Sequence, residues 1–233
     1  MKVILLAAGY GTRLYPLTKD MPKALIKINN ITILDRILSE LKNEACHLVT
    51  NNKFYNHFLQ HSMGQYSVIN DGTSSNDDRL GAVGDIMHTI KIESINEDVL
   101  IVNTDNMFGC NIQDFIQFAR SQPYSVTACK DMQHKDNVRE RFGVVVHNED
   151  NIVTQFQEKP NEPLSTLASV GLYYIKKKDL ELIEECAKKS ADNTGDMIKY
   201  FVEKTEVAVW PFSQSWSDVG THDSLKEASK KFL

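Results

Sequence analysis

MKVILLAAGYGTRLYPLTKDMPKAL, residues 1–25, is the stretch that decides the fold of this chain. The run from Val3 to Leu6 is short, apolar and unbroken, which is typical of a strand buried on both faces of a parallel sheet. Ala7-Ala8-Gly9-Tyr10-Gly11 follow, in which two alanines and two glycines leave the backbone uncovered, and glycine lets a ligand approach backbone N–H groups closely. A strand that ends in a glycine loop predicts an α/β fold with an anion-binding loop after its first strand.

Two cations extend this loop. Arg13, at its end, can make a bidentate contact with a phosphate. Lys23 follows Pro22, which restricts Met21 and makes the stretch rigid. Two fixed cations beside a glycine loop favour a polyanion such as a nucleoside triphosphate. For the two glycines alone, an ordinary tight strand-to-helix connection is the alternative.

The stretch contains neither of the two best-known phosphate loops, because GxxxxGK[ST] is absent and GYGTRL lacks the third glycine of a dinucleotide fingerprint. It resembles instead the signature of sugar-1-phosphate nucleotidyltransferases, AAGxGTRLxPLTxxxPKxL, and matches it at every fixed position. The resemblance implies a three-layer, Rossmann-like fold of the glycosyltransferase A type, with a mostly parallel mixed sheet and helices on both faces. It also implies that the loop binds a nucleotide through Leu6, Ala7, Ala8, Gly9, Gly11, Thr12, Arg13 and Lys23.

Composition limits the class of protein. The 233 residues suffice for a large α/β core, and no repeat or low-complexity linker divides them, so we expect a single nucleotidyltransferase domain over 1–233. The net charge of −5 argues against nucleic acid or an anionic membrane surface as the main partner. No apolar run approaches the roughly 20 residues of a membrane span. Met1 leads straight into the predicted first strand, so we expect no signal peptide.

The four cysteines lie far apart and form no CxxC pair: Cys46, Cys110, Cys129 and Cys186. Each lies beside or among apolar residues, which predicts four reduced core residues and no zinc site. Reduced thiols are typical of a cytoplasmic protein, so we expect a cytoplasmic location.

Downstream of the signature, helical and strand-like apolar spacings alternate. Helices are predicted over 31–41, 54–61, 81–91, 112–119, 178–188, 196–202 and 221–232. Strands are predicted over 47–50, 66–69, 99–102, 124–129, 142–146, 152–156, 170–175 and 207–210, with 142–156 as a hairpin. The alternation implies right-handed crossovers and a mostly parallel sheet. We expect the helix over 196–202 to belong to a small lid-like or dimerising segment.

The segment 71–86 begins as a polar loop and continues into a helix. In the resembled family a loop at this place holds the nucleotide base, and the sequence LGAVG fits its glycine-rich helix start. The resemblance therefore implies that Gly81 and Ala82 bind the nucleotide. Asp85 is a departure, because the family commonly has a small residue there. A flexible surface loop that caps the helix is the alternative.

A carboxylate follows the apolar strand 99–102 at its carboxyl end. Ligands lie at that edge of an open parallel sheet, and Mg²⁺ prefers one or two carboxylates together with phosphate oxygens. Asp105 is therefore a candidate magnesium ligand and nucleotide-binding residue, with a capping aspartate as the alternative. In the resembled family an aspartate at this position binds the metal.

Three later motifs resemble the same family. Phe156-Gln157-Glu158-Lys159-Pro160 matches FxEKP, although by composition alone it predicts only a surface turn. The match implies that Lys159 pairs with the phosphate of a sugar 1-phosphate and that Glu158 accepts hydrogen bonds from sugar hydroxyls. Gly143 and Gly171 lie in segments similar to YGVV and aGxYxF, whose glycines face the sugar.

The last motif, WSDVGT at 216–221, matches WxDxGT. It makes Asp218 the second metal ligand, with a turn carboxylate near a helix start as the alternative. Thr221 is the expected N-cap of the helix that follows.

Together the resemblances imply a Mg²⁺-dependent enzyme that makes an NDP-sugar and pyrophosphate from an NTP and a sugar 1-phosphate. The sugar phosphate would attack the α-phosphorus in line, with Arg13, Lys23, Asp105 and Asp218 as catalytic residues. The AAG opening favours a pyrimidine nucleotide. Such a product serves nucleotide-sugar biosynthesis and cell-surface polysaccharide. Members of the family frequently dimerise, which makes a homodimer one candidate assembly.

Two alternatives stay open. A cytidylyltransferase that acts on a non-sugar phosphate such as phosphocholine would share the N-terminal signature and the Asp-Asn pair at 105–106, but such enzymes tend to lack the EKP motif. A nucleotide-binding regulatory protein without catalysis is the other alternative. Retention of Arg13, Lys23, Asp105, Lys159 and Asp218 together weighs against it.

Overall fold

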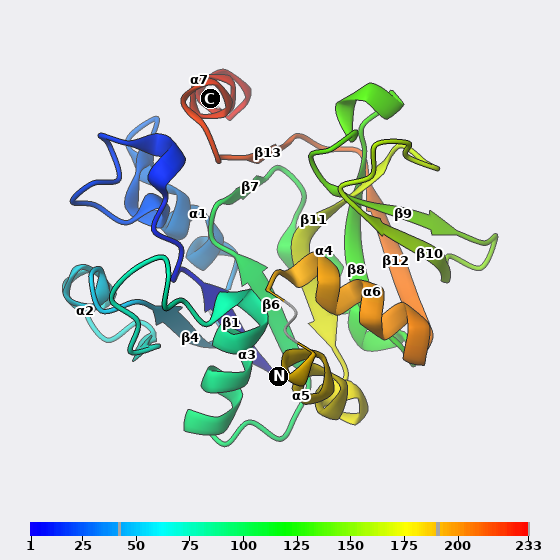
Figure 1. Cartoon of the computed structure of the whole chain (residues 1–233), viewed down its shortest axis with the longest axis horizontal. Helices are drawn as coiled ribbons and strands as arrows, with labels where there is room; N and C mark the ends of the chain where they lie inside the picture. The colour runs from blue at the N-terminus through cyan, green and yellow to red at the C-terminus, as the bar shows by residue number, and fades with distance from the viewer. Residues whose placement is uncertain (42, 190–191, 233) are drawn as a thin grey trace.

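A mixed sheet runs through the molecule (Figure 1). The computed structural model describes residues 1–41, 43–189 and 192–232, and within these ranges nine strands form the sheet. The main path is β10-β9-β11-β6-β1-β4-β5, while β8 pairs with β11 and β12 with β8. The strands are β1 Lys2–Leu6, β4 Ala45–Thr50, β5 Ser67–Asn70, β6 Val99–Asn103, β8 Ser125–Asp131, β9 Gly143–His147, β10 Val153–Glu158, β11 Leu167–Ile175 and β12 Val207–Phe212.

Strand direction divides the sheet. β6, β1, β4 and β5 are parallel neighbours, as expected where helices return the chain between strands. β11 runs antiparallel to β6, β8 and β9, and β9 with β10 forms the predicted hairpin. The parallel part places the carboxyl ends of β1 and β6 side by side, which is where ligands bind in open α/β sheets.

Helices cover both faces of the sheet, as the predicted three-layer fold requires (Figure 1). Neighbouring residues of β1 show the division, because Val3 and Leu5 lie in one apolar cluster and Ile4 lies in the other. The helices that pack into the first cluster are α1 Ile33–Glu40, α2 Tyr55–Ser62, α4 Ile112–Ser121 and α7 His222–Lys231. Those that pack into the second are α3 Gly81–Ile92, α5 Leu180–Lys188 and α6 Thr194–Lys204.

Caps set two helix starts. α1 begins later than predicted because the hydroxyl of Thr32 accepts a hydrogen bond from the Asp35 N–H at 2.9 Å, so Thr32 is its N-cap. Thr221 caps α7 as predicted, and Ser224 completes a reciprocal capping box with it.

The predicted role of the helix over 196–202 is wrong in one respect. α6 is no lid, because Met197, Ile198 and Phe201 are fully buried in the apolar cluster that it shares with α3 and α5. Its contacts with β10 also anchor it to the hairpin. The helix is therefore part of the core.

Two short strand pairs were not predicted. β7, Asn106–Phe108, pairs antiparallel with β13, Trp216–Asp218. β2, Lys27–Ile28, pairs with β3, Ile31–Thr32. The β7–β13 pair matters for the site, because it joins the segment after β6 to the WSDVGT motif.

The sequence predicted buried, reduced cysteines and no segment apolar enough to span a membrane. The four cysteines are buried and free, as expected. Across the described ranges, no helix combines the length and the apolar character needed to cross a membrane.

Candidate functional site

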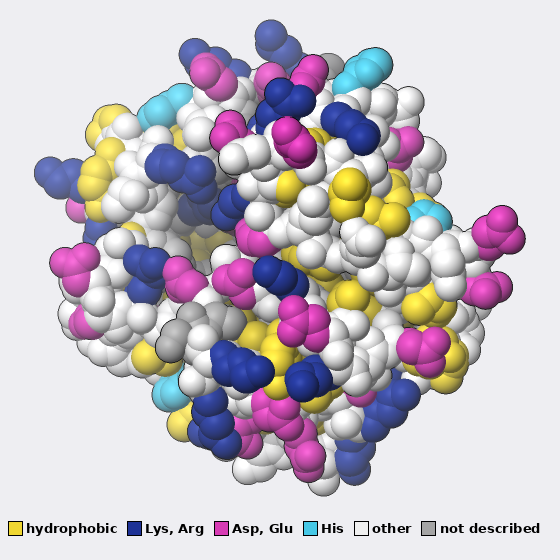
Figure 2. All heavy atoms as spheres, turned by 45° about the vertical axis from the view of Figure 1, so that its right-hand side comes forward, with side chains coloured by type: hydrophobic (Ala, Val, Ile, Leu, Met, Phe, Trp, Pro, Cys, Tyr) yellow, Lys and Arg dark blue, Asp and Glu magenta, His cyan; other side chains and the backbone are white. Residues whose placement is uncertain are grey.

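Two adjoining cavities open at the carboxyl ends of β1 and β6. The larger has a volume of about 360 Å³ and the smaller about 170 Å³, and both are lined by Asn103 and Asp105. Figure 2 shows a hollow on this face, bordered by Lys and Arg side chains with acidic side chains nearby. Two ligands that occupied the two cavities would thus meet at Asp105.

The larger cavity collects every residue that the sequence assigned to nucleotide binding: Leu6, Ala7, Ala8, Gly9, Gly11, Thr12, Arg13, Lys23, Gly81, Ala82 and Asp105. It also contains residues that the sequence did not single out as ligands: Ala24, Asp71, Arg79, Asp85, Asn103, Thr104, Asp192 and Gly220. The polar loop of 71–80 is exposed over 74–80, as the surface-loop alternative expects, but Asp71 and Thr73 at its start are buried.

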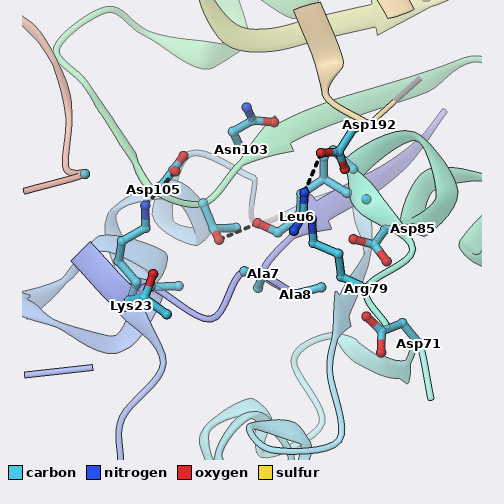
Figure 3. A pocket seen from close by; sticks show the side chains of 18 of the residues that line it. Leu6, Ala7, Ala8, Lys23, Asp71, Arg79, Asp85, Asn103, Asp105 and Asp192 are labelled. Carbon is cyan, nitrogen blue, oxygen red and sulfur yellow. Dashed lines mark hydrogen bonds and ion pairs between the residues drawn. The ribbon is translucent and has the colours of Figure 1, made fainter. Parts of the chain in front are cut away.

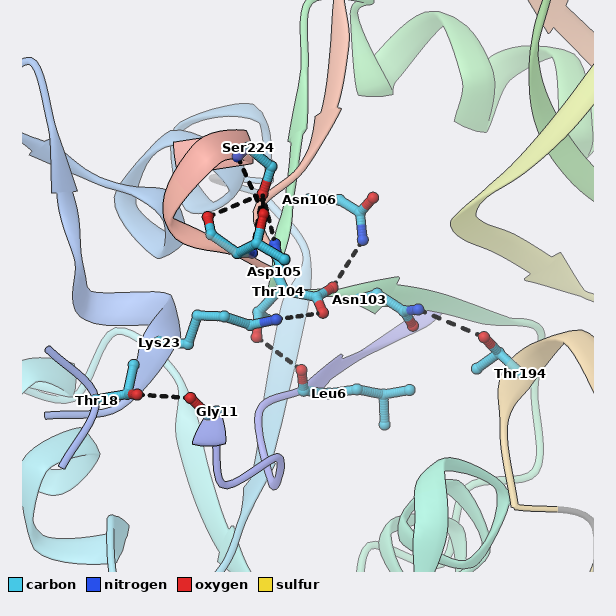
Figure 4. Close-up of polar contacts among 12 residues, drawn as sticks. Leu6, Gly11, Thr18, Lys23, Asn103, Thr104, Asp105, Asn106, Thr194 and Ser224 are labelled. Atoms are coloured by element: carbon cyan, nitrogen blue, oxygen red, sulfur yellow. Dashed lines mark hydrogen bonds and ion pairs between the residues drawn. The ribbon is translucent and has the colours of Figure 1, made fainter. Parts of the chain in front are cut away.

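The glycine loop is held open by its own signature residues. Gly11 has φ of 63°, and a Cβ there would lie 3.2 Å from the side chain of Thr18. The hydroxyl of Thr18 donates to the Gly11 carbonyl at 2.6 Å (Figure 4). Nothing lies within 4 Å of the place where a Cβ of Gly9 would stand, so the backbone of the loop remains accessible.

Lys23 and Asp105 form an ion pair inside the cavity, with 2.6 Å between Nζ and Oδ2 (Figure 4). The Asn106 amide donates to the other carboxylate oxygen of Asp105 at 2.8 Å. Burial alone would raise the pKa of the Asp105 carboxyl, but the Lys23 ammonium outweighs burial and holds the pKa below its usual value. Asp105 is therefore an anion that two neighbours hold in place.

The β7–β13 pair brings Asp218 to Asp105 from far along the chain. Asp218 lies opposite Asn106 in the ladder, and the Val219 N–H donates to the Asp105 carbonyl at 2.8 Å. The Trp216 indole donates to the Asn106 side-chain oxygen at 2.8 Å. Burial and the nearby Asp105 carboxylate raise the pKa of Asp218 to about 6.

This carboxylate pair fits a hard cation. The raised pKa of Asp218 means that negative charge is in excess between Asp218 and Asp105, which a divalent ion would offset. Among the described residues, no group of three or more His, Cys, Asp or Glu side chains converges on a metal position. Two carboxylates completed by the phosphate oxygens of a substrate is the donor set that Mg²⁺ commonly takes.

The smaller cavity collects the residues that the later motifs predicted: Gly143, Glu158, Lys159, Gly171 and Asp218. Gly171 has φ of 70°, and a Cβ there would lie 2.8 Å from the Asn103 side chain. The Lys159 ammonium lies 3.4 Å from the Glu158 carboxylate. Burial raises the pKa of Glu158, and Lys159 partly offsets this effect. The Lys159 side chain is 55% exposed, so its ammonium is free to turn towards an entering anion.

The start of α6 completes this cavity, and the sequence reasoning missed it. Asn193 is the N-cap and accepts from the Asp196 N–H at 2.9 Å. The Thr194 hydroxyl accepts from Tyr173 at 3.2 Å and lies 3.4 Å from the amide of Asn103. A Cβ on Gly195 would overlap the Glu158 carboxylate. The sequence NTG at a helix start was the available signal.

Arg141 is a second residue that the sequence did not identify. It lies directly after residues 130–140, a run of charged side chains that is typical of a solvated loop, yet it lines the smaller cavity. Its guanidinium lies 4.9 Å from the ring centre of Phe142 and is among the cations that lower the pKa of Asp218. The cavity therefore contains two cations, Lys159 and Arg141, beside the carboxylate pair.

Comparison with known proteins gives three kinds of match. The family model described as Nucleotidyl transferase matches residues 2–233. The curated relative "Bifunctional protein GlmU" of Methanocaldococcus jannaschii is 29% identical over 240 residues, and the match covers 100% of this chain. It covers 54% of that relative, so the chain spans about half the length of the curated relative it matches.

Two solved structures share the fold. A structure described as a glucose-1-phosphate thymidylyltransferase of Bacillus anthracis, in complex with sucrose, has a TM-score of 0.84 and 22% identity, over 99% of this chain and 94% of that one. A UDP-glucose pyrophosphorylase complexed with UDP-glucose has a TM-score of 0.79 and 19% identity, over 98% of this chain and 97% of that one.

Proposed function

Because the chain belongs to the nucleotidyl transferase family, we propose that it transfers a nucleotidyl group from a nucleoside triphosphate to a sugar 1-phosphate and releases pyrophosphate. The family that residues 1–25 predicted is confirmed by the match over 2–233. The observation that carries the proposal is the pair of cavities that share Asp105, with the glycine loop on one side and the EKP turn on the other. The similarity to a glucose-1-phosphate thymidylyltransferase and to a UDP-glucose pyrophosphorylase supports a sugar phosphate as the acceptor.

In this reaction a phosphate oxygen of the sugar 1-phosphate bonds to the α-phosphorus, and the bond from the α-phosphorus to the pyrophosphate oxygen breaks. The nucleophile is already an anion, so no general base is required. The protein must instead neutralise two polyanions and align them. The proposed roles are Arg13 for the departing pyrophosphate, Lys23 for the α-phosphate and Lys159 for the attacking phosphate. Backbone N–H groups at Gly9 and Gly11 would bind the triphosphate.

Asp105 and Asp218 would hold Mg²⁺, which supplies positive charge to the phosphates when bound. Lys23 neutralises Asp105 at 2.6 Å in this structure. Because the same ammonium lines the larger cavity, it is placed to contact a phosphate once another cation balances Asp105. The carboxylate pair thus couples cation binding to the release of Lys23.

In the smaller cavity, Gly143, Gly171 and Glu158 would bind the sugar. The absence of a side chain at Gly195 leaves room for the Glu158 carboxylate at the cavity wall. We further propose that 1–233 acts as one catalytic unit in the cytoplasm, as a monomer or a homodimer. A pyrimidine triphosphate would be its donor, and its NDP-sugar would serve nucleotide-sugar and cell-surface polysaccharide synthesis.

The test is pyrophosphate release in the presence of Mg²⁺, with ATP, CTP, GTP, UTP and dTTP each combined with a panel of sugar 1-phosphates and with phosphocholine. We expect release with one nucleotide and a sugar 1-phosphate. Release with CTP and phosphocholine alone would replace the sugar phosphate by a non-sugar acceptor. Nucleotide binding without release from any pair would overturn the proposal in favour of a binding protein.

A further inference from the structure

Two carboxyl groups that the proposed reaction does not use lie at one end of the larger cavity. Asp71 follows β5 and is 8% exposed, while Asp85 lies in the second turn of α3 and is 6% exposed. Both line the cavity, and Figure 3 shows them on the side of Arg79, away from Lys23 and Asp105. Among the described residues, neither carboxyl forms an ion pair, and Arg79, which lines the same cavity, pairs with Asp192 at 2.7 Å.

The hydrogen bonds of the two carboxyls differ. One oxygen of Asp71 accepts from the Thr73 N–H at 2.7 Å and from the Thr73 hydroxyl at 2.8 Å. Within the part of the chain that the structure describes, Oδ1 of Asp85 is buried and has no hydrogen-bond partner. A buried acceptor without a donor is unfavourable. The Asp71 side chain lies within hydrogen-bond reach of Asp85, so a proton held between the two carboxyls supplies one donor. The Asp85 side chain also lines the larger cavity, so a ligand there can bring a further donor.

The pair acts as an acceptor group. Two carboxylates buried against each other cannot both ionise, so they hold one proton between them. Burial, with the repulsion of Asp71, raises the pKa of Asp85 to about 8, and burial raises the pKa of Asp71 as well. With that proton between the two groups, a carboxyl oxygen that reaches the cavity offers lone pairs to a ligand.

We propose that the Asp71–Asp85 pair selects nucleotides whose base carries an exocyclic amino group, which among the pyrimidines is cytosine. An amino group has two N–H bonds, and carboxylate side chains accept hydrogen bonds from the cytosine amino group in other settings. Uracil and thymine have a carbonyl oxygen in place of the amino group, and that oxygen would face the acceptors. This inference rests on the proposed function, because it takes the larger cavity as the nucleotide site.

The experiment measures nucleotide binding by calorimetry with Mg²⁺ and without a sugar phosphate, so that it does not depend on turnover. The ligands are CTP, GTP, ATP, UTP, dTTP and the triphosphate of pyrimidin-2-one riboside, which is CTP without its amino group. We expect CTP to bind about tenfold or more tightly than UTP and than the analogue without the amino group, a factor that corresponds to about 1.4 kcal/mol.

Two variants locate the effect. In Asp85→Asn and in Asp71→Asn the amide adds N–H donors, so we expect the ratio of CTP to UTP affinity to fall by about tenfold. Asp77→Asn is the matched control, because it removes the same charge from the same loop at an exposed position outside both cavities. Inorganic tripolyphosphate should bind equally to all four proteins, since it has no base.

The outcomes separate the inference from the function. Tightest binding of UTP or dTTP, or an unchanged CTP to UTP ratio in Asp85→Asn, would overturn the inference whatever the enzyme catalyses. Tightest binding of GTP or ATP would support the amino-group selection and overturn the pyrimidine assignment. Selective binding of an amino base without pyrophosphate release would support the inference and overturn the proposed reaction. If neither variant folds, the comparison of CTP with the pyrimidin-2-one analogue on the unaltered protein decides.

Discussion

Asp105 is the residue at which the two cavities meet, and its surroundings make its charge testable. Its carboxylate forms an ion pair with the Lys23 ammonium at 2.6 Å and accepts a hydrogen bond from the Asn106 amide at 2.8 Å. Asp105→Asn keeps the size of the side chain and removes the anion, so the variant should fold but bind Mg²⁺ poorly. We expect pyrophosphate release to fall by about 10² or more, the loss typical of removing one electrostatic contact from a transition state.

The measurement for this variant is turnover at saturating substrates, with the melting temperature as the check on folding. Asp150→Asn, in the exposed turn between β9 and β10, is the control for loss of an acidic side chain. Full activity of Asp105→Asn would remove this residue from the site.

Lys159 is a second residue whose proposed partner can be tested separately. Its side chain lines only the smaller cavity and contacts Glu158 at 3.4 Å. Lys159→Ala should raise KM for the sugar phosphate by about tenfold, because a charged contact to that substrate is lost. KM for the nucleotide should change much less. Lys230→Ala, an exposed lysine on α7, is the control, and equal effects on the two KM values would contradict the assigned partner.

At the scale of elements, the β7–β13 pair holds Asp105 and Asp218, the proposed metal ligands, next to each other. The Trp216 indole N–H donates to Asn106, whose amide donates to Asp105. Trp216→Phe removes the N–H and keeps an aromatic ring against Phe142, which now lies 4.9 Å away between ring centres. We expect kcat to fall several-fold, because Asn106 loses its anchor, and stability to fall by about 1 kcal/mol for one buried hydrogen bond.

The matched control is Trp210→Phe. Trp210 packs between Phe115 and Phe212 on β12, away from both cavities, so its loss should lower stability and leave kcat unchanged. A kcat effect of the same size in both variants would assign the Trp216 result to general destabilisation.

Elements also show why part of the fold could be predicted and part could not. β1, β6 and α4 have five or more residues with a clear apolar pattern, so periodicity was sufficient to find them. β7 and β13 have three residues each, and their pairing joins distant parts of the chain, which no local pattern encodes. The same limit explains the missed start of α6, because tertiary packing brings Asn193 to the EKP turn.

In the candidate site, too, some residues could be predicted from the sequence and others could not. Residues within long motifs, such as Arg13 and Lys159, were found by resemblance, and the structure places them at the two cavities. Asp71 and Arg141 lie beside charged or polar loops, where composition predicts only a solvated surface. Asp85 was noticed as a departure from the family pattern, but its burial against Asp71 became evident only in three dimensions.

At the scale of the whole molecule, positively charged side chains gather at the two cavities although the protein as a whole is acidic. The net charge is −5, yet Arg13, Lys23, Lys159 and Arg141 gather at the two cavities. Four carboxyls that line the same cavities have raised pKa values: Asp71, Asp85, Glu158 and Asp218. Buried acids of this kind make stability depend on pH, because the folded protein holds protons that the unfolded chain releases.

Asp85 gives this dependence a direction. Its pKa is raised from 3.8 to about 8 in the folded protein, by burial, by Asp71 and by Asp192. Between these two pKa values the folded state binds the extra proton, so its contribution to stability is complete below pH 4 and is lost as pH rises towards 8. In that interval this group lowers the free energy of unfolding by up to about 1.4 kcal/mol per pH unit.

Asp85→Asn replaces the titrating group with a neutral amide that can donate to Asp71. The free energy of unfolding of the variant, minus that of the unaltered protein, should therefore increase from pH 5 to pH 8. Urea unfolding of both proteins at a fixed temperature across that pH range measures this difference. Asp77→Asn, an exposed change of the same charge, should follow the unaltered protein at every pH. A difference between Asp85→Asn and the unaltered protein that stays constant from pH 5 to pH 8 would mean that Asp85 is ionised throughout. The shared proton, and with it the acceptor-only character of the Asp71–Asp85 pair, would then be wrong.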